Sequence, residues 1–140
     1  MRRLVPDASV LLKWVLPSSN ETLVSEAIAV RDAHVTGRVE LLLPSLWLYE
    51  AGNTLARKYP THGEIMHSDI VDFGIRTVEP TSAVLRTTFD LVRRWGVTFY
   101  DASYHALALA HRATLITADE RYFAKAKEAG SILRLANFAA

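Results

Sequence analysis

RLVPDAS, residues 3–9, is the most informative stretch of the chain, because an apolar run leads directly into an aspartate and then into a new amphipathic segment. Residues 4–6 are typical of a short buried strand, and residues 9–16 are typical of a helix. Asp7 lies between them, where its carboxylate can accept hydrogen bonds from the free N–H groups of that helix. One such aspartate is an ordinary helix cap, so the arrangement becomes informative only where it recurs.

The arrangement of strand, aspartate and helix recurs twice in the second half of the chain. Residues 97–100, VTFY, lead into Asp101 and an alanine-rich segment, and residues 114–118, TLITA, lead into Asp119 and a further helical segment. Each run predicts a strand that ends at an aspartate. In a parallel sheet the carboxyl ends of the strands form the functional edge, so we expect all three aspartates at that edge.

The remaining elements alternate between strand and helix. Further strands are predicted at residues 41–43, 75–79 and 132–135, the second of them at an edge of the sheet. Pro44 suits the first turn of the next helix, and Ser18 with Glu21 has the spacing of a capping box. The sequence therefore predicts an α/β fold, a three-layer α/β/α sandwich with a central, mainly parallel sheet of about five strands.

Composition sets the outer limits. A chain of 140 residues with 50% hydrophobic and 22% charged residues predicts a single globular domain, 1–140. The lack of cysteine excludes disulfides and thiolate zinc sites and indicates a reducing compartment, so we expect a cytoplasmic protein. Pro6, Asp7 and Lys13 interrupt the apolar N-terminus, which therefore predicts neither a secretion signal nor a membrane span. The net charge of +1 predicts no extended basic face.

Glu50 is a fourth acidic candidate. It lies about a turn and a half into the helix predicted after residues 41–43, where it can lean toward the three aspartates. Carboxylates in one crevice repel one another, and a divalent cation removes that repulsion. Oxygen ligands without cysteine favour Mg²⁺ or Mn²⁺ over zinc. Such a metal can activate water and stabilise charge on a phosphoryl oxygen, so the residues themselves indicate phosphoester chemistry.

Three neutral polar residues, Ser9, Asn53 and Thr117, each lie two or three positions from one of the acidic residues. Asn53 follows Glu50 at a spacing that places both on one face of the helix. Hydroxyl and amide groups can orient water molecules around a cation, and each also has an ordinary role as a local partner of the backbone. We expect these three residues to support the acidic site.

Four segments together resemble the motifs of the PIN-domain ribonucleases, in particular the small bacterial and archaeal VapC-type toxins. They are DASVLLKW (7–14), YEAGNTLARK (49–58), YDASYHALALAH (100–111) and LITADERY (115–122). Motif order, spacing and total length agree, so the resemblance covers nearly the whole chain. A mild departure is Gly52, because glycine inside a helix costs about 1 kcal/mol.

The resemblance implies that Asp7, Glu50, Asp101 and Asp119 are the catalytic residues and ligate the metal, directly or through water. It implies a Mg²⁺- or Mn²⁺-dependent endoribonuclease that cleaves RNA and acts as the toxin of a type II toxin–antitoxin system. The family further implies a cognate antitoxin that blocks the acidic pocket, often with an inserted basic side chain, and a homodimer. The alternative is a catalytically weak or inactive PIN scaffold that binds an antitoxin or RNA.

His105 supports a rival interpretation, because it lies four residues after Asp101 on the same helix face, where an imidazole can act as a general base or ligand. No second histidine has the spacing that such a site requires. Two other α/β classes fit less well. A response-regulator receiver requires an acidic pair after the first strand, where Pro6 precedes Asp7, and a haloacid-dehalogenase-like phosphatase requires an aspartate at the position of Ser9.

Small basic clusters are candidates for RNA contact, but none is assigned. They are Lys13, residues 57–58, residues 93–94, and Lys125 with Lys127. Lysine and arginine most often lie on solvated helix faces, so their presence alone indicates no binding site.

Overall fold

The computed structural model describes residues 1–139 and contains one sheet of parallel strands in the order β3-β2-β1-β4-β5. The strands are β1 (Arg2–Pro6), β2 (Val39–Pro44), β3 (Arg76–Val78), β4 (Thr114–Thr117) and β5 (Ile132–Arg134). Leu4 of β1 pairs with Leu41 on one side and with Thr114 on the other. Because β1 is the central strand, Asp7 leaves the sheet at the middle of its carboxyl edge.

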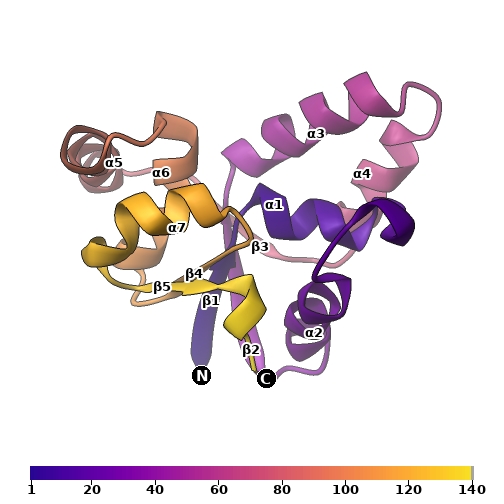
Figure 1. The fold of residues 1–140 in the computed structure, drawn as a ribbon, viewed down its shortest axis with the longest axis horizontal. Coiled ribbons are helices and arrows are strands. Elements are labelled where there is room, and N and C mark those ends of the chain that lie inside the picture. The colour runs from indigo at the N-terminus through magenta and orange to yellow at the C-terminus, as the bar shows by residue number, and fades with distance from the viewer. Residues whose placement is uncertain (140) are drawn as a thin grey trace.

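Helices lie on both sides of the sheet (Figure 1), which confirms the predicted three-layer α/β fold. They are α1 (Ala8–Leu11), α2 (Val24–Val35), α3 (Leu46–Lys58), α4 (Gly63–Val71), α5 (Ser82–Trp95), α6 (Phe99–Ala110) and α7 (Glu120–Ala126). Four short 3-10 helices are η1 (Leu12–Trp14), η2 (Ser18–Asn20), η3 (Lys127–Ala129) and η4 (Leu135–Asn137). The helix predicted at 9–16 is thus a turn of α-helix that tightens into η1.

The strands divide the interior into two apolar cores, because successive side chains of a strand point to opposite faces of the sheet. The core shared with α2 and η4 includes Leu4, Leu41, Ile116 and Leu135. The core on the other face includes Val5, Leu42, Leu115 and the buried face of α6. This burial on both faces explains why the strands are continuous apolar runs, which is the usual pattern for a covered parallel sheet.

The strand predicted at residues 97–100 is wrong. Gly96 ends α5 in the left-handed conformation, with φ +65°, and the Thr98 hydroxyl already accepts the backbone N–H of Asp101 at 3.1 Å as the N-cap of α6. Only three residues, 96–98, therefore separate α5 from α6, which is too short for a strand and a turn. Asp101 lies in the first turn of α6 and not directly after a strand.

The predicted capping box of Ser18 and Glu21 is also wrong. Ser18 belongs to η2, and α2 begins only at Val24, after Leu23 with a left-handed φ of +56°. Glu21 instead accepts a hydrogen bond from the buried Lys13 ammonium at 3.0 Å, so a tertiary ion pair replaces the local cap. Pro44 is the last residue of β2 and not part of the helix that follows.

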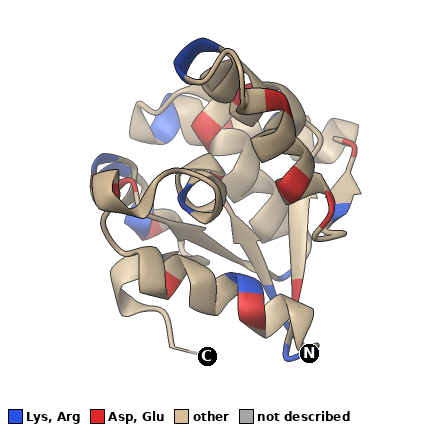
Figure 2. Ribbon diagram, turned by 90° about the vertical axis from the view of Figure 1, so that its right-hand side faces the viewer, with Lys and Arg blue, Asp and Glu red and all other residues tan. Residues whose placement is uncertain are grey.

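The surface shows two further properties. On the side drawn in Figure 2, lysine and arginine positions are dispersed over several elements and do not form one continuous basic face. Among residues 1–139, no helix combines the length and apolar character that a membrane crossing needs. The first observation agrees with the small net charge of the sequence.

Replacing Gly63 by alanine should lower the free energy of unfolding by about 1–3 kcal/mol, the usual cost of overpacking. A methyl group at Gly63 would lie 2.6 Å from the Leu55 carbonyl oxygen, where α4 crosses α3. The matched control is Gly52→Ala, whose methyl group would meet only the His67 ring at 3.6 Å. That control should be neutral or stabilising by up to about 1 kcal/mol, because alanine is the better helix former. Urea denaturation measures both, and equal stability of the two variants would contradict the predicted close packing.

Candidate active site

Asp7 is fixed at the carboxyl end of the central strand by its own backbone. Its N–H donates to the Ile116 carbonyl of β4 at 3.1 Å, and its extended conformation, φ −82° and ψ 178°, makes it the N-cap of α1. The side-chain oxygen Oδ1 accepts the backbone N–H of Ser9 at 3.0 Å and also the Ser9 hydroxyl. The capping role expected from the sequence and the position at the sheet edge therefore coexist in one residue.

Two hydroxyl groups join Asp7 to the end of β4. The Ser9 hydroxyl oxygen accepts the Ala118 N–H at 3.0 Å, and the Thr117 hydroxyl oxygen accepts the Asp119 N–H at 3.0 Å. Each hydroxyl also forms a hydrogen bond with the Asp7 carboxylate. Ser9 and Thr117 thus connect the loop after β1 with the loop after β4 and hold the Asp7 carboxylate between them.

The Asp7 carboxyl is costly to ionise in this position. Burial raises its pKa to about 6, against the opposing effect of the hydrogen bonds from Ser9 and Thr117, and the charge of Asp101 raises the pKa further. A carboxylate that accepts several hydrogen bonds and still has a raised pKa is one that a cation would stabilise strongly. Asp7 therefore has the electrostatic character of an anionic ligand that lacks a counter-charge within the protein.

Asp101 is the electrostatic centre of the acidic residues. Burial raises its pKa, a hydrogen bond with the Thr98 side chain lowers it, and the charge of Asp119 raises it. The charge of Asp101 in turn raises the pKa of Asp7 and of Glu50. The charge of Asp101 therefore acts on Asp7 and Glu50, and that of Asp119 acts on Asp101, so each of the four predicted residues is within electrostatic reach of at least one other.

Glu50 is oriented by a residue that the sequence did not single out. Tyr104, fully buried in α6, donates its hydroxyl to Glu50 Oε1 at 2.8 Å. Burial raises the pKa of Glu50, while this hydrogen bond lowers it and the charge of Asp101 raises it. Burial and the neighbouring Glu50 also raise the pKa of the Tyr104 phenol, which keeps it a donor. The sequence feature that could have identified Tyr104 is its spacing of three residues from Asp101, which places both on the same helix face.

Asp119 caps α7, and its Oδ1 accepts the Tyr122 N–H at 3.0 Å. With Asp101 it lines a pocket of about 290 Å³. Glu50 and the exposed Asn53 line a different pocket of about 460 Å³, beside Tyr49 and Tyr100. The acidic site is therefore open to solvent through two hollows, one on the side of α7 and one on the side of α3. Asn53 lines the second hollow beside Glu50.

The donor chemistry of the site fits a hard divalent cation. Its residues supply carboxylate oxygens only, and three of the four have raised pKa values through burial and mutual repulsion, both of which a bound cation relieves. Among residues 1–139, no three His, Cys, Asp or Glu side chains lie close enough together to hold a metal ion as they stand. Binding a cation directly would therefore draw the carboxylates closer, and ligation through water would need less movement.

His105 forms part of the core, not of the acidic site. Its side chain is fully buried, and Nε2 lies 2.7 Å from the Gly130 carbonyl, which can only accept a hydrogen bond. Nε2 therefore carries the proton, and Nδ1 is left to accept the Tyr122 hydroxyl at 2.8 Å. Burial lowers the pKa of His105, which favours this neutral form. Both imidazole nitrogens are therefore occupied by hydrogen bonds, one to α7 and one to the loop before β5.

Comparison with known proteins gives consistent results. Residues 4–129 match the PIN domain family. The chain is 30% identical over 105 residues to exonuclease VapC9 of Pyrobaculum aerophilum, covering 70% of this chain and 76% of the relative. The fold is similar to that of VapC20 of Mycobacterium tuberculosis, a Sarcin-Ricin loop cleaving toxin, with a TM-score of 0.68 at 14% identity over 91% of this chain and 95% of the other.

A toxin–antitoxin complex from Klebsiella pneumoniae contains a chain of the same fold. Its TM-score is 0.68 at 16% identity, and the match covers 94% of this chain and 97% of that chain. Both structural matches therefore cover more than nine-tenths of this chain.

The raised pKa of Asp7 predicts a pH-dependent stability for the metal-free protein. Between pH of about 4 and 6 the folded state holds a proton that the unfolded chain has released, so the contribution of Asp7 to stability falls as pH rises through this range. Asp7→Asn removes this loss and should stabilise the protein in EDTA at pH 7 by on the order of 2 kcal/mol. The difference in unfolding free energy between variant and wild type should be small at pH 4. A difference that does not change with pH would contradict the raised pKa.

Proposed function

Because this chain belongs to the PIN domain family, we propose that it is a metal-dependent endoribonuclease that uses Mg²⁺ or Mn²⁺. The observation that carries the proposal is the coupling of Asp101 to Asp7, Glu50 and Asp119 at the carboxyl edge of the sheet. The relation to VapC9, an exonuclease, supports nuclease activity, and the Sarcin-Ricin loop cleaving toxin of the same fold supports RNA as the substrate. Internal cleavage is the form of attack that an open edge site permits.

The residues of the chain have separate tasks in this proposal. A bound divalent cation supplies activation of water and stabilisation of charge on a phosphoryl oxygen. Ser9 and Thr117 hold the Asp7 carboxylate in one orientation, and Tyr104 does the same for Glu50. Such fixed orientation lowers the cost of gathering like charges around one cation. Asn53, exposed beside Glu50, is placed to bind water or the substrate at the mouth of the site.

We also propose that the protein is the toxin of a type II pair in the cytoplasm, with a cognate antitoxin as partner. The similar fold found in a toxin–antitoxin complex supports this assignment. The electrostatics of the site suggest how inhibition works. A basic side chain of the antitoxin placed among the carboxylates would relieve the same repulsion as a cation, so antitoxin and metal should compete.

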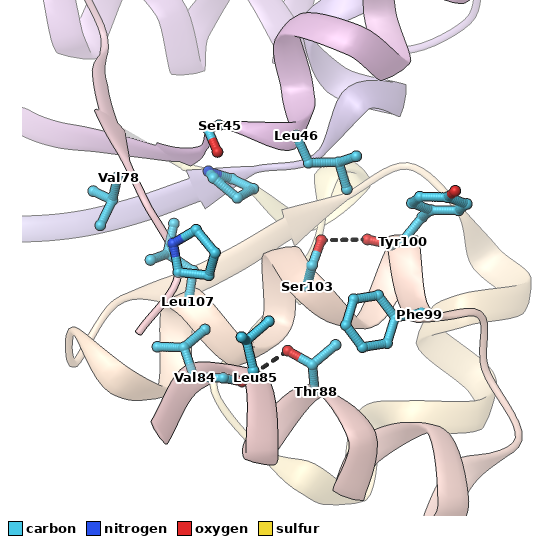
Figure 3. Close-up of a pocket in the computed structure, with 12 residues that line it drawn as sticks. Ser45, Leu46, Val78, Val84, Leu85, Thr88, Phe99, Tyr100, Ser103 and Leu107 are labelled. Atoms are coloured by element: carbon cyan, nitrogen blue, oxygen red, sulfur yellow. Dashed lines mark hydrogen bonds between the residues drawn. The ribbon is translucent and has the colours of Figure 1, made fainter. Parts of the chain in front are cut away.

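A homodimer is the remaining part of the proposal, and α5 and α6 offer the surface for it. Phe89, Phe99 and Tyr100 are exposed, and the first two pack edge to face with ring centroids 5.0 Å apart. Beside them an apolar cavity of about 130 Å³ opens between α5, α6 and the end of β2, with Leu85 and Leu46 on its walls (Figure 3). Contiguous exposed apolar surface of this kind is typical of interfaces. Light scattering of the purified chain tests the expected mass.

Cleavage of a mixed structured RNA pool in Mn²⁺ tests the nuclease proposal. We expect cutting by the wild type, none in EDTA, and a loss in Asp101→Asn larger than the roughly 10- to 100-fold that removal of an outer-shell partner causes. The substitution removes the central charge while keeping the shape. The matched control is Asp69→Asn on the exposed face of α4, which should cut like the wild type.

Three results would count against the nuclease. RNA cleavage that persists in EDTA would exclude a metal-dependent enzyme. Equal cleavage by Asp101→Asn and the wild type would exclude the acidic residues as the catalytic site. A folded, antitoxin-free protein that never cuts across a titration of Mn²⁺, yet binds RNA or an antitoxin, would establish the inactive scaffold instead.

Tyr104→Phe should weaken Mn²⁺ binding by about 10- to 100-fold, because Glu50 loses the hydrogen bond that orients it. The same loss raises the pKa of Glu50 further, since that hydrogen bond holds it down. The acidic limb of the pH–rate profile should therefore move to higher pH. Isothermal titration and the pH profile measure the two effects, with Tyr59→Phe at the end of α3 as control. An unchanged affinity and profile would show that Tyr104 only fills the core.

A further inference from the structure

The pocket on the α7 side of the site combines acidic and basic residues. Asp101 and Asp119 line this hollow of about 290 Å³ together with Arg121 and Lys125. The two basic residues are four positions apart on α7, so they lie on one face of the helix, and both are exposed. Lys125 donates to the Gly96 carbonyl at 3.3 Å, which holds its ammonium group at the rim. Two cations thus lie beside the carboxylates.

Arg121 and Lys125 share the hollow with Asp101 and Asp119 but form no ion pair with them. Within residues 1–139, none of the ion pairs includes either residue. Glu120, which adjoins Arg121 in sequence, is instead bound by Arg134 at 2.8 Å. The buried Lys13, by contrast, is committed to Glu21. The pair on α7 therefore offers positive charge to a ligand outside the chain.

The two hollows beside the site differ in this respect. No lysine or arginine lines the hollow that contains Glu50 and Asn53, whereas the α7 hollow contains two. An RNA strand is a polyanion that the acidic edge repels, so backbone phosphates next to the cleaved one gain most from cations. Of the two hollows, the one beside α7 contains such cations.

We propose that Arg121 and Lys125 form a phosphate subsite that binds the RNA backbone next to the scissile phosphate. The inference rests on the proposed ribonuclease function and adds to it the side on which the strand is held. The Arg121 guanidinium can bind two phosphate oxygens in parallel, and the Lys125 ammonium adds a point charge. Contacts of this kind position a strand without reading its sequence, so specificity for a target must come from elsewhere.

The test measures binding separately from cleavage. A short, unstructured, fluorescein-labelled RNA of mixed sequence is titrated with protein in EDTA over a salt series, with fluorescence anisotropy as readout. Arg121→Gln/Lys125→Gln should bind the RNA roughly tenfold more weakly. The negative slope of log K against log salt should become shallower by about 0.7, because the variant neutralises one phosphate fewer. Both residues are exposed, so circular dichroism should show an unchanged fold.

The matched control removes the same charge from the opposite edge of the sheet. Arg38 and Arg112 are exposed and lie just before β2 and β4, at the amino ends of those strands. Arg38→Gln/Arg112→Gln should keep the affinity and the salt slope of the wild type. A control that weakens binding as much as the test variant would show that net charge alone governs binding, and would overturn the subsite.

The remaining outcomes separate the subsite from the nuclease. RNA binding that needs Arg121 and Lys125 in a protein that never cuts would sustain the subsite and reject the nuclease. Cutting by the wild type, with affinity and slope unchanged in the double variant, would reject the subsite and keep the nuclease. Unchanged RNA affinity in the double variant is also the result expected if Arg121 and Lys125 bind an acidic segment of a protein partner and not RNA. A wild type that neither binds nor cuts RNA would reject both.

Discussion

The burial of neighbouring carboxylates, together with their mutual repulsion, is the constraint on which the rest of the site depends. Burial raises the pKa of Asp7, Glu50 and Asp101, and neighbouring charge raises each further: that of Asp101 acts on Asp7 and Glu50, and that of Asp119 acts on Asp101. The parallel fold gathers these carboxylates, because its strands end and the helices that follow them begin at one edge of the sheet. The arrangement lowers the stability of the metal-free protein, which the two apolar cores offset. A divalent cation bound at this edge would relieve that cost, which favours metal binding there.

The fold holds these like charges in place with neutral hydrogen-bond donors. The Ser9 and Thr117 hydroxyls bind Asp7 while they accept backbone N–H groups from the loop after β4. Tyr104 reaches Glu50 from the buried face of α6. None of these donors adds a positive charge, so the site stays anionic and the counter-charge must come from a cation or from a partner. Basic residues lie just outside, on α7, where they can meet a substrate without neutralising the carboxylates.

The sequence predicts most of the fold and the four acidic residues, and its errors have local causes. Asp7 and Asp119 follow apolar strands directly, so their pattern is readable over a few residues. Asp101 was identified from a strand that does not exist: VTFY has β-forming residues, but the Thr98 cap starts a helix there. Tyr104 was missed because its partner Glu50 is 54 residues away. The ion pair of Lys13 with Glu21 likewise depends on tertiary structure that no local spacing shows.

The most direct test of the account is anomalous scattering from crystals of the protein soaked in Mn²⁺. We expect one or two anomalous peaks between Asp7, Glu50, Asp101 and Asp119, at coordination distance from their oxygens or linked to them through water. Asp101→Asn crystals treated in the same way should show no such peaks. Mn²⁺ bound elsewhere on an active enzyme, with no peak among these residues, would contradict the claim that their burial and mutual repulsion create the metal site.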